Sequence, residues 1–251
     1  MPLLEVQGLV KIYPGGVEAL RGVSFSLEEG EVFGLVGPNG SGKTTLLRIV
    51  ATLLKPTRGR VVLDGVDAVR EPGEARRRLA YVPEEVGGYR RLTGLEYLSF
   101  VVGAFLSARG ASMREVEEAL EEAVRLTGLS RRQLGRRMQE YSKGMKRRLQ
   151  VAWALAVKPR LAILDEPTSG LDMEAGYELR RVIAGYARSH GVTVLMSSHN
   201  LFEVEYLCDR VAFMKNGRVI DMGSPRELIA RYGARNLEEA YMSAVAERGA
   251  A

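Results

Sequence analysis

The sequence predicts an α/β domain in which a mostly parallel sheet follows an antiparallel β part and is interrupted by a helical segment. The apolar run at residues 32–36 leads directly into a glycine-rich loop and then into a helical pattern. Further short apolar runs are typical of buried strands. Between residues 95 and 157 the apolar spacing becomes helical. The 251 residues, 46% of them hydrophobic, suffice for a large core.

Strand patterns fill the first part of the chain. Apolar and polar residues alternate within residues 4–9 and again within residues 23–27, which predicts antiparallel strands with one face in water. Residues 60–65 show another strand pattern that ends in a turn. Residues 79–82 show a further one, which Pro83 closes. We therefore expect a β-rich N-terminal part before the helical segment.

Helical spacing marks the middle of the chain, and strand patterns resume after it. Apolar residues recur with a helical period within 97–105 and 116–126, and Gly128 is a helix stop. Asn216-Gly217 is a two-residue hairpin signal. The later strand patterns lie at residues 161–164, 192–196, 211–214 and 218–220.

These patterns predict one domain with three parts. Residues 1–90 and 159–225 are expected to form the core, residues 91–158 a helical subdomain, and residues 226–251 a short C-terminal helical tail. We find no internal repeat, low-complexity segment or long flexible linker in the sequence.

The composition favours a cytoplasmic protein. No stretch approaches the roughly 18 uninterrupted apolar residues that a spanning helix needs. Residues 1–5 lack the basic region of a signal peptide. Cys208 is the single cysteine, which agrees with a reducing compartment.

The net charge of +5 raises the question of a nucleic acid or an anionic membrane surface as partner. Arginine clusters such as Arg76-Arg77-Arg78 are interleaved with glutamate or lie on predicted helix faces. They lack the interleaved aromatic residues of a base-stacking platform. We interpret most of them as solvated surface and expect no specific nucleic acid partner.

A phosphate-binding loop is the most specific motif. Glycines between a strand and a helix let successive backbone N–H groups turn toward a β-phosphate, and the helix directs its positive end at the same group. Lys43 supplies a charge to the β and γ oxygens, and the Thr44 hydroxyl suits Mg²⁺. The predicted nucleotide-binding residues are Gly37, Pro38, Asn39, Gly40, Ser41, Gly42, Lys43, Thr44 and Thr45.

Two acids follow the apolar run at residues 161–164. Asp165 and Glu166 would lie at the carboxyl edge of a buried parallel strand, where α/β proteins bind ligands. Asp165 suits a role near Mg²⁺, and Glu166 suits a general base that polarises a water attacking the γ-phosphate.

A second anion site is predicted at residues 142–145, ahead of a helix expected from about Lys146 to Val157. It offers a hydroxyl and backbone N–H groups at a helix N-terminus. The simpler alternative is that Ser142 only caps this helix. With one phosphate loop in the chain, a spare anion site suggests that it closes over the nucleotide of a second subunit. Its residues are Ser142, Lys143, Gly144 and Met145.

With these motifs in this order, the chain resembles the nucleotide-binding subunits of ATP-binding-cassette (ABC) transporters over nearly its whole length. The resemblance implies the fold of a P-loop NTPase core, ATP and Mg²⁺ as ligands, ATP hydrolysis as the activity, and a second nucleotide-binding subunit as partner. It also implies a separate transmembrane permease and a place on the inner face of the cell membrane.

The resemblance also implies roles for individual residues. Tyr13 corresponds to the aromatic that stacks on adenine, and Glu84 to a residue that senses Mg²⁺ and the attacking water, so Thr44, Glu84 and Asp165 form the expected metal site. Residues 142–145 correspond to the signature loop, which contacts the partner subunit's γ-phosphate. His199 corresponds to the switch histidine, and it follows a strand pattern at the same sheet edge as Glu166. The loop that communicates across the dimer corresponds to Ser169, Gly170, Leu171 and Asp172.

Several positions depart from the family pattern. Glu84 stands where glutamine is usual, and Lys143 and Met145 replace the usual glycine and glutamine. Together with Tyr89, these features resemble the subfamily that serves drug, antibiotic and sodium exporters with separate permeases. The alternative is a soluble ABC ATPase in iron–sulfur assembly, translation or DNA-associated work.

The segment at residues 84–93 joins the predicted core to the helical segment. Its glycines permit movement, and Tyr89 and Leu92 offer apolar side chains between charges. We expect both side chains to be exposed and to contact a permease.

Overall fold

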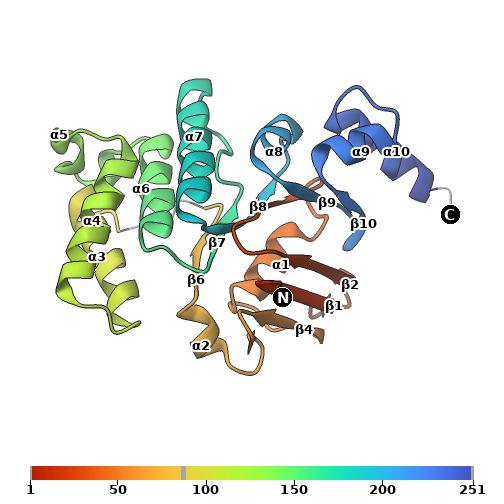
Figure 1. Ribbon diagram of the computed structural model, residues 1–251, viewed down its shortest axis with the longest axis horizontal. Helices are drawn as coiled ribbons and strands as arrows, with labels where there is room; N and C mark the ends of the chain where they lie inside the picture. Colours follow the sequence, from red (N-terminus) through yellow and green to blue (C-terminus); the bar gives the residue numbers. More distant parts are fainter. Residues whose placement is uncertain (1, 86–88, 250–251) are drawn as a thin grey trace.

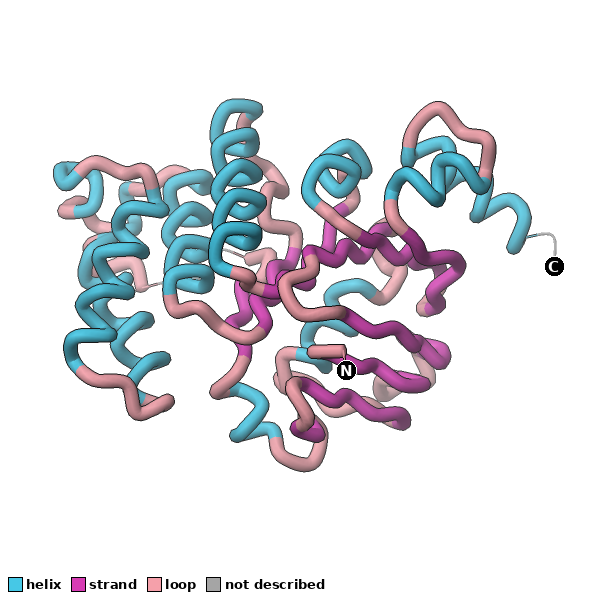
Figure 2. The backbone as a smooth tube through the Cα atoms, viewed as in Figure 1, coloured by secondary structure: helices cyan, strands magenta, loops and turns pink. Residues whose placement is uncertain are grey.

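Two β-sheets organise the fold (Figures 1 and 2). The computed structural model describes residues 2–85 and 89–249. In the smaller sheet, of four strands, all neighbouring strands run antiparallel. In the six-stranded sheet, neighbours run parallel except at the edge, where β10 runs antiparallel to β9. The predicted α/β class, with a mostly parallel sheet and an N-terminal antiparallel part, is confirmed.

The strand order explains which loops meet. In the smaller sheet the order is β2 (Glu18–Leu27), β1 (Leu4–Ile12), β4 (Arg58–Leu63) and β5 (Val66–Asp67). In the larger sheet the order is β10 (Arg218–Gly223), β9 (Arg210–Lys215), β3 (Val32–Val36), β8 (Thr193–Ser198), β7 (Leu161–Asp165) and β6 (Leu79–Val82). The carboxyl ends of β3, β8, β7 and β6 therefore lie along one edge of one sheet.

Helices occupy most of residues 95–157, where the spacing predicts them, and they also lie between strands elsewhere in the chain. One group, α3, α4, α5 and α6, lies together at one end of the molecule, on the left in Figure 1. The helices are α1 (Lys43–Val50), α2 (Pro72–Arg76), α3 (Gly94–Ser107), α4 (Met113–Thr127), α5 (Arg131–Leu134), the 3-10 helix η1 (Met138–Glu140), α6 (Lys143–Ala156), α7 (Met173–His190), α8 (Leu201–Leu207), α9 (Pro225–Arg231) and α10 (Leu237–Gly249).

The core has two clusters, one on each face of the larger sheet. Successive side chains of a strand point to opposite faces. Accordingly Phe33 and Leu35 of β3 join the cluster that holds α1 and the smaller sheet, while Val32 and Val36 join the cluster beneath α6, α7 and α8. The loop after β3 is thus anchored by a strand that is buried on both faces.

Local signals set several element ends, among them the predicted helix stop at Gly128 and the predicted hairpin at Asn216-Gly217. Thr93 and Ser112 each form a capping box at the start of α3 and α4. Gly128 ends α4 with a φ of 63°, a left-handed conformation that glycine adopts without strain. Asn216 and Gly217 both have positive φ and connect β9 to β10 in the predicted hairpin.

Two expectations were wrong in detail. The helix expected from about Lys146 begins at Lys143, because the Ser142 hydroxyl accepts the Met145 N–H at 3.2 Å and caps the first turn. Leu92 is half-buried and packs against the core rather than standing exposed. Tyr89 is exposed as expected, with 49% of its surface accessible. Residues 86–88 of the same predicted loop lie outside the described residues.

The division into a core, a helical subdomain and a tail stays a prediction. Within the described ranges, no helix is both long and apolar enough to cross a bilayer.

Candidate active site

The phosphate loop occupies the turn between β3 and α1. The Ser41 N–H donates to the Pro38 carbonyl at 3.1 Å, which closes the turn. Gly42 has a φ of 105°, where a side chain would be strained, and a Cβ there would lie 2.7 Å from the Ala19 carbonyl oxygen. A Cβ at Gly37 would overlap the Met214 carbonyl oxygen. The loop therefore needs glycine for both its conformation and its close packing.

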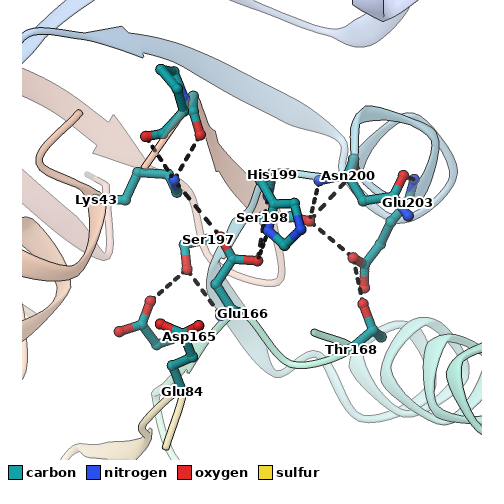
Figure 3. Close-up of polar contacts among 12 residues, drawn as sticks. Lys43, Glu84, Asp165, Glu166, Thr168, Ser197, Ser198, His199, Asn200 and Glu203 are labelled. Carbon is teal, nitrogen blue, oxygen red and sulfur yellow. Dashed lines mark hydrogen bonds and ion pairs between the residues drawn. The ribbon is translucent and has the colours of Figure 1, made fainter. Parts of the chain in front are cut away.

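Lys43 begins α1 and is buried. Its ammonium donates to the Gly37 carbonyl at 2.7 Å and to the Pro38 carbonyl at 3.3 Å, and its Nζ lies 3.7 Å from Glu166 Oε1 (Figure 3). The loop thus wraps around a positive charge that also faces the carboxylate at the end of β7. An anion that enters the loop would meet this ammonium together with the helix N-terminus.

Asp165 lies at the end of β7, within reach of the loop. The Thr44 hydroxyl donates to Asp165 Oδ1 at 3.3 Å, and the Ser197 hydroxyl donates to the same oxygen at 2.6 Å. The Tyr81 hydroxyl donates to the other oxygen, Oδ2, at 3.4 Å. Burial, together with the Asp165 charge, raises the pKa of Tyr81 to about 12, so it remains a donor at neutral pH.

The Glu166 carboxylate and His199 are in direct contact. Glu166 is buried, and its φ of 48° turns the chain sharply after β7. His199 Nδ1 lies 2.8 Å from Glu166 Oε2, and the His199 N–H donates to the same oxygen at 3.3 Å (Figure 3). The imidazole side chain is 56% exposed. A buried carboxylate between an ammonium and an accessible imidazole is suited to orient a water and to accept its proton.

Glu84 and Tyr13 lie at the borders of this site. Glu84 is exposed and follows β6, which pairs with β7, so its backbone lies at the same sheet edge as Asp165. Tyr13 is half-buried directly after β1, and its hydroxyl lies 3.3 Å from Thr45 Oγ1. The aromatic ring is therefore held beside the start of α1, next to the loop.

Residues 142–145 and 169–172 lie against each other within the chain. A Cβ at Gly170 would overlap Lys143 Nζ, and a Cβ at Gly144 would lie 3.8 Å from Leu171 Cδ2. Asp172 caps α7 by accepting the Ala175 N–H at 2.8 Å. Among residues 2–85 and 89–249, no hydrogen bond or ion pair joins residues 142–145 to the phosphate loop.

The family is settled by comparison with known proteins. The family described as ABC transporter matches residues 20–169. The chain belongs to the ABC transporter family. It is an ABC ATPase, with the fold and the ATP-binding loop of that family.

Named relatives of this ABC ATPase are ATP-binding proteins. The ABC transporter ATP-binding protein NatA of Bacillus subtilis (strain 168) is 36% identical over 228 residues, which cover 90% of each chain. The daunorubicin/doxorubicin resistance ATP-binding protein DrrA of Streptomyces peucetius is 36% identical over 249 residues, which cover 98% of this chain and 73% of DrrA.

Solved structures agree with the fold. An ATP-binding subunit of an ABC transporter superposes with a TM-score of 0.85 at 33% identity and covers 97% of this chain and 99% of its own. A dimer of the ATP-binding cassette MJ0796, bound to ADP and Pi, superposes with a TM-score of 0.79 at 27% identity, over 88% of this chain and 98% of that one.

The sequence analysis missed three contributors to this ABC site. Ser197 donates to Asp165 and accepts the Glu166 N–H at 3.0 Å. Arg147 of α6 is fully buried and donates to the Pro83 carbonyl at 2.6 Å and to the Glu84 carbonyl. The third contributor is Glu203, a buried residue of α8. The place of Ser197 in the same strand pattern, two residues before His199, was a signal for it, but no local pattern marks Arg147 or Glu203.

The residues present fit a magnesium nucleotide. The Thr44 hydroxyl and the Asp165 carboxylate are hard oxygen ligands of the type that Mg²⁺ takes, and they already lie 3.3 Å apart. The buried Ser41 hydroxyl within the loop has no hydrogen-bond partner among the described residues. Both observations are consistent with a loop built to surround phosphate and its cation.

Proposed function

We propose that the chain is the ATP-hydrolysing subunit of an exporter, that it works as a dimer and that it drives a separate membrane permease from the inner face of the membrane. The observation that carries the proposal is the cluster of Lys43, Asp165, Glu166 and His199 at one sheet edge beside the phosphate loop. The names of NatA and DrrA, an ATP-binding protein of a transporter and one of drug resistance, support the transport role.

The proposed reaction is hydrolysis of the γ-phosphate. Residues 37–45 bind the phosphates, Lys43 stabilises charge on the β and γ oxygens, and Tyr13 stacks on the base. Glu166 orients a water and accepts its proton as the water oxygen bonds to phosphorus, and the bond to ADP breaks. His199 contacts the γ-phosphate and holds the Glu166 carboxylate. Thr44, Asp165 and Glu84 would hold Mg²⁺, which neutralises phosphate charge when bound.

A second copy would complete the site. Residues 142–145 have no polar contact with the phosphate loop of their own chain among the described residues, although they end in a helix N-terminus that suits an anion. We propose that Ser142, Lys143, Gly144 and Met145 close over the nucleotide of the partner and that residues 169–172 transmit this closure. The dimeric state of MJ0796 with ADP and Pi supports the pairing of two copies.

An exposed apolar surface on the helical part is the proposed permease contact. It consists of Tyr89, Leu95 and Phe100, which are 49%, 45% and 53% exposed. The Tyr89 ring packs on Phe100, with centroids 5.4 Å apart. Clustered aromatic side chains of this kind favour a protein interface. Leu92, which was expected to take part, instead packs inward.

Replacement of the proposed base tests the central claim. Glu166→Gln keeps the shape of the side chain but cannot accept the proton, so we expect ATP to bind and hydrolysis to slow by orders of magnitude. The variant should then form a dimer with Mg-ATP, measured by size exclusion with light scattering. Glu117→Gln, on the exposed surface of α4, is the matched control; it should hydrolyse ATP and therefore should not accumulate as an ATP-bound dimer. A monomeric Glu166→Gln at saturating Mg-ATP would contradict the shared site.

A further inference from the structure

A buried carboxylate that the proposed reaction does not use lies beside the Glu166 and His199 pair. Glu203 of α8 has only 3% of its surface exposed. Its Oε2 accepts hydrogen bonds from Thr168 Oγ1 at 2.6 Å and from Ser198 Oγ at 2.9 Å (Figure 3). Thr168 follows Glu166 by two residues, and Ser198 directly precedes His199. One oxygen atom therefore joins the loops after β7 and β8.

The helix that carries this oxygen is itself fixed to the same loop. The Asn200 side chain accepts the N–H groups of Phe202 at 3.1 Å and Glu203 at 3.3 Å. The Asn200 N–H in turn donates to Ser198 Oγ at 3.0 Å. Val204, next to Glu203, is fully buried in the core. The position of the Glu203 carboxylate is thus fixed by the packing of α8 and by the Asn200 contacts that hold α8 to the loop after β8.

The two oxygens of Glu203 are used unequally. Both hydroxyls donate to Oε2, whereas the buried Oε1 has no hydrogen-bond partner in the part of the chain that the structure describes. Desolvation by burial raises the pKa of the Glu203 carboxyl. The hydrogen bonds from Thr168 and Ser198 act in the opposite direction and lower this pKa. What both hydroxyls require at this place is an acceptor oxygen.

We propose that Glu203 is a positioning residue for hydrolysis: it ties Thr168 to Ser198 and so keeps Glu166 within hydrogen-bond distance of His199. The inference rests on the proposed roles of Glu166 and His199. Because Thr168 also precedes residues 169–172, the same contact links the γ-phosphate side of the site to the segment proposed to meet the second subunit. In this role Glu203 acts through Thr168 and Ser198 and not through contact with the nucleotide or the attacking water.

Four variants test the proposal on the whole chain. Glu203→Leu removes the acceptor, and Thr168→Val removes one donor with little change in shape. Both should lower kcat by about tenfold or more, because misplacing a catalytic group by about 1 Å can cost up to a hundredfold. The KM for ATP should stay within about twofold, since the phosphate loop is untouched. Glu203→Gln retains an acceptor oxygen and should recover most of the lost kcat. Glu205→Gln, an exposed change on the same helix, should behave as wild type.

The outcomes separate this inference from the proposed function. If Glu203→Leu fails to fold, Thr168→Val alone decides, because it should show the same fall in kcat at unchanged KM. Wild-type kcat in Thr168→Val, or a Glu203→Gln as slow as Glu203→Leu, would overturn the positioning role while leaving hydrolysis by Glu166 intact. A wild-type chain that does not hydrolyse ATP would overturn both.

Discussion

At the scale of single residues, the site depends on where a few charges are held. Lys43 donates to two loop carbonyls and faces Glu166 at 3.7 Å, so it is oriented before any phosphate arrives. Preorganised donors of this kind stabilise developing charge more than flexible ones do, because they need no rearrangement during the reaction. The buried Glu166 carboxylate is also held in place before the reaction, between the ammonium of Lys43 and the imidazole of His199.

Removal of the Lys43 ammonium should therefore abolish most of the activity. We expect Lys43→Ala to lower kcat by about 10²- to 10³-fold, because the transition state loses a charged donor that no neutral residue replaces. Phosphate release by the purified protein measures this. Lys55→Ala, at an exposed lysine just after α1, is the control and should hydrolyse ATP normally. Undiminished phosphate release from Lys43→Ala would show that Lys43 has no role in hydrolysis.

At the scale of elements, one buried arginine connects the helical part to the sheet edge. Arg147 lies in the second turn of α6, and its guanidinium donates to the carbonyls of Pro83 and Glu84 directly after β6. Desolvation by burial lowers the pKa of Arg147. The guanidinium nevertheless keeps its positive charge, as arginine does in proteins. The contact means that α6, whose first turn holds residues 143–145, cannot shift without disturbing the segment that holds Glu84.

The stability of this connection can be measured. Arg147→Met fills similar space but leaves both carbonyls without their charged donor, so we expect the free energy of unfolding to fall by about 2 kcal/mol, the net of lost hydrogen bonds and relieved charge burial. Urea denaturation followed by circular dichroism gives the value. Arg132→Met, on the exposed side of α5, should leave the midpoint unchanged. If Arg147→Met unfolds at the wild-type midpoint, the connection adds no net stability.

At the scale of the whole molecule, the proposed function gives two parts of the fold different tasks. The sheet edge beside α1 holds the proposed chemistry, and the helical group on the left in Figure 1 carries the exposed surface of Tyr89, Leu95 and Phe100. The contact of Arg147 with the carbonyls of Pro83 and Glu84 connects the two parts. In this arrangement, closure of two copies over ATP would move the apolar surface together with α6. Hydrolysis would then let the two copies separate and the surface return.

A double substitution tests the surface without touching the site. We expect Tyr89→Ala with Phe100→Ala to leave ATP affinity of the isolated chain within a few-fold and to weaken co-purification with its permease and export, because the exposed aromatic contact is lost. Met113→Ala, an exposed apolar change at the start of α4, serves as the control. Full export and normal co-purification in the double variant would refute the contact and would leave the ATPase assignment intact.

Much of this protein follows from local patterns in its sequence. The α/β class, the phosphate loop, the acids at the end of β7 and the hairpin at Asn216-Gly217 depend on residues that are neighbours in the chain, where spacing and backbone preference decide the structure. The carboxyl ends of parallel strands share one edge, which is why His199 could be expected near Glu166.

Only the tertiary structure decided how distant segments are held against each other. The register that pairs Asp165 with Ser197 brings that hydroxyl to the carboxylate proposed to hold Mg²⁺. The packing of α6 on the sheet buries Arg147, and the seating of α8 directs Glu203 to the loops after β7 and β8. Each contact joins residues between five and some sixty positions apart in the chain. Their approach depends on strand order and helix packing, which side-chain spacing alone does not specify.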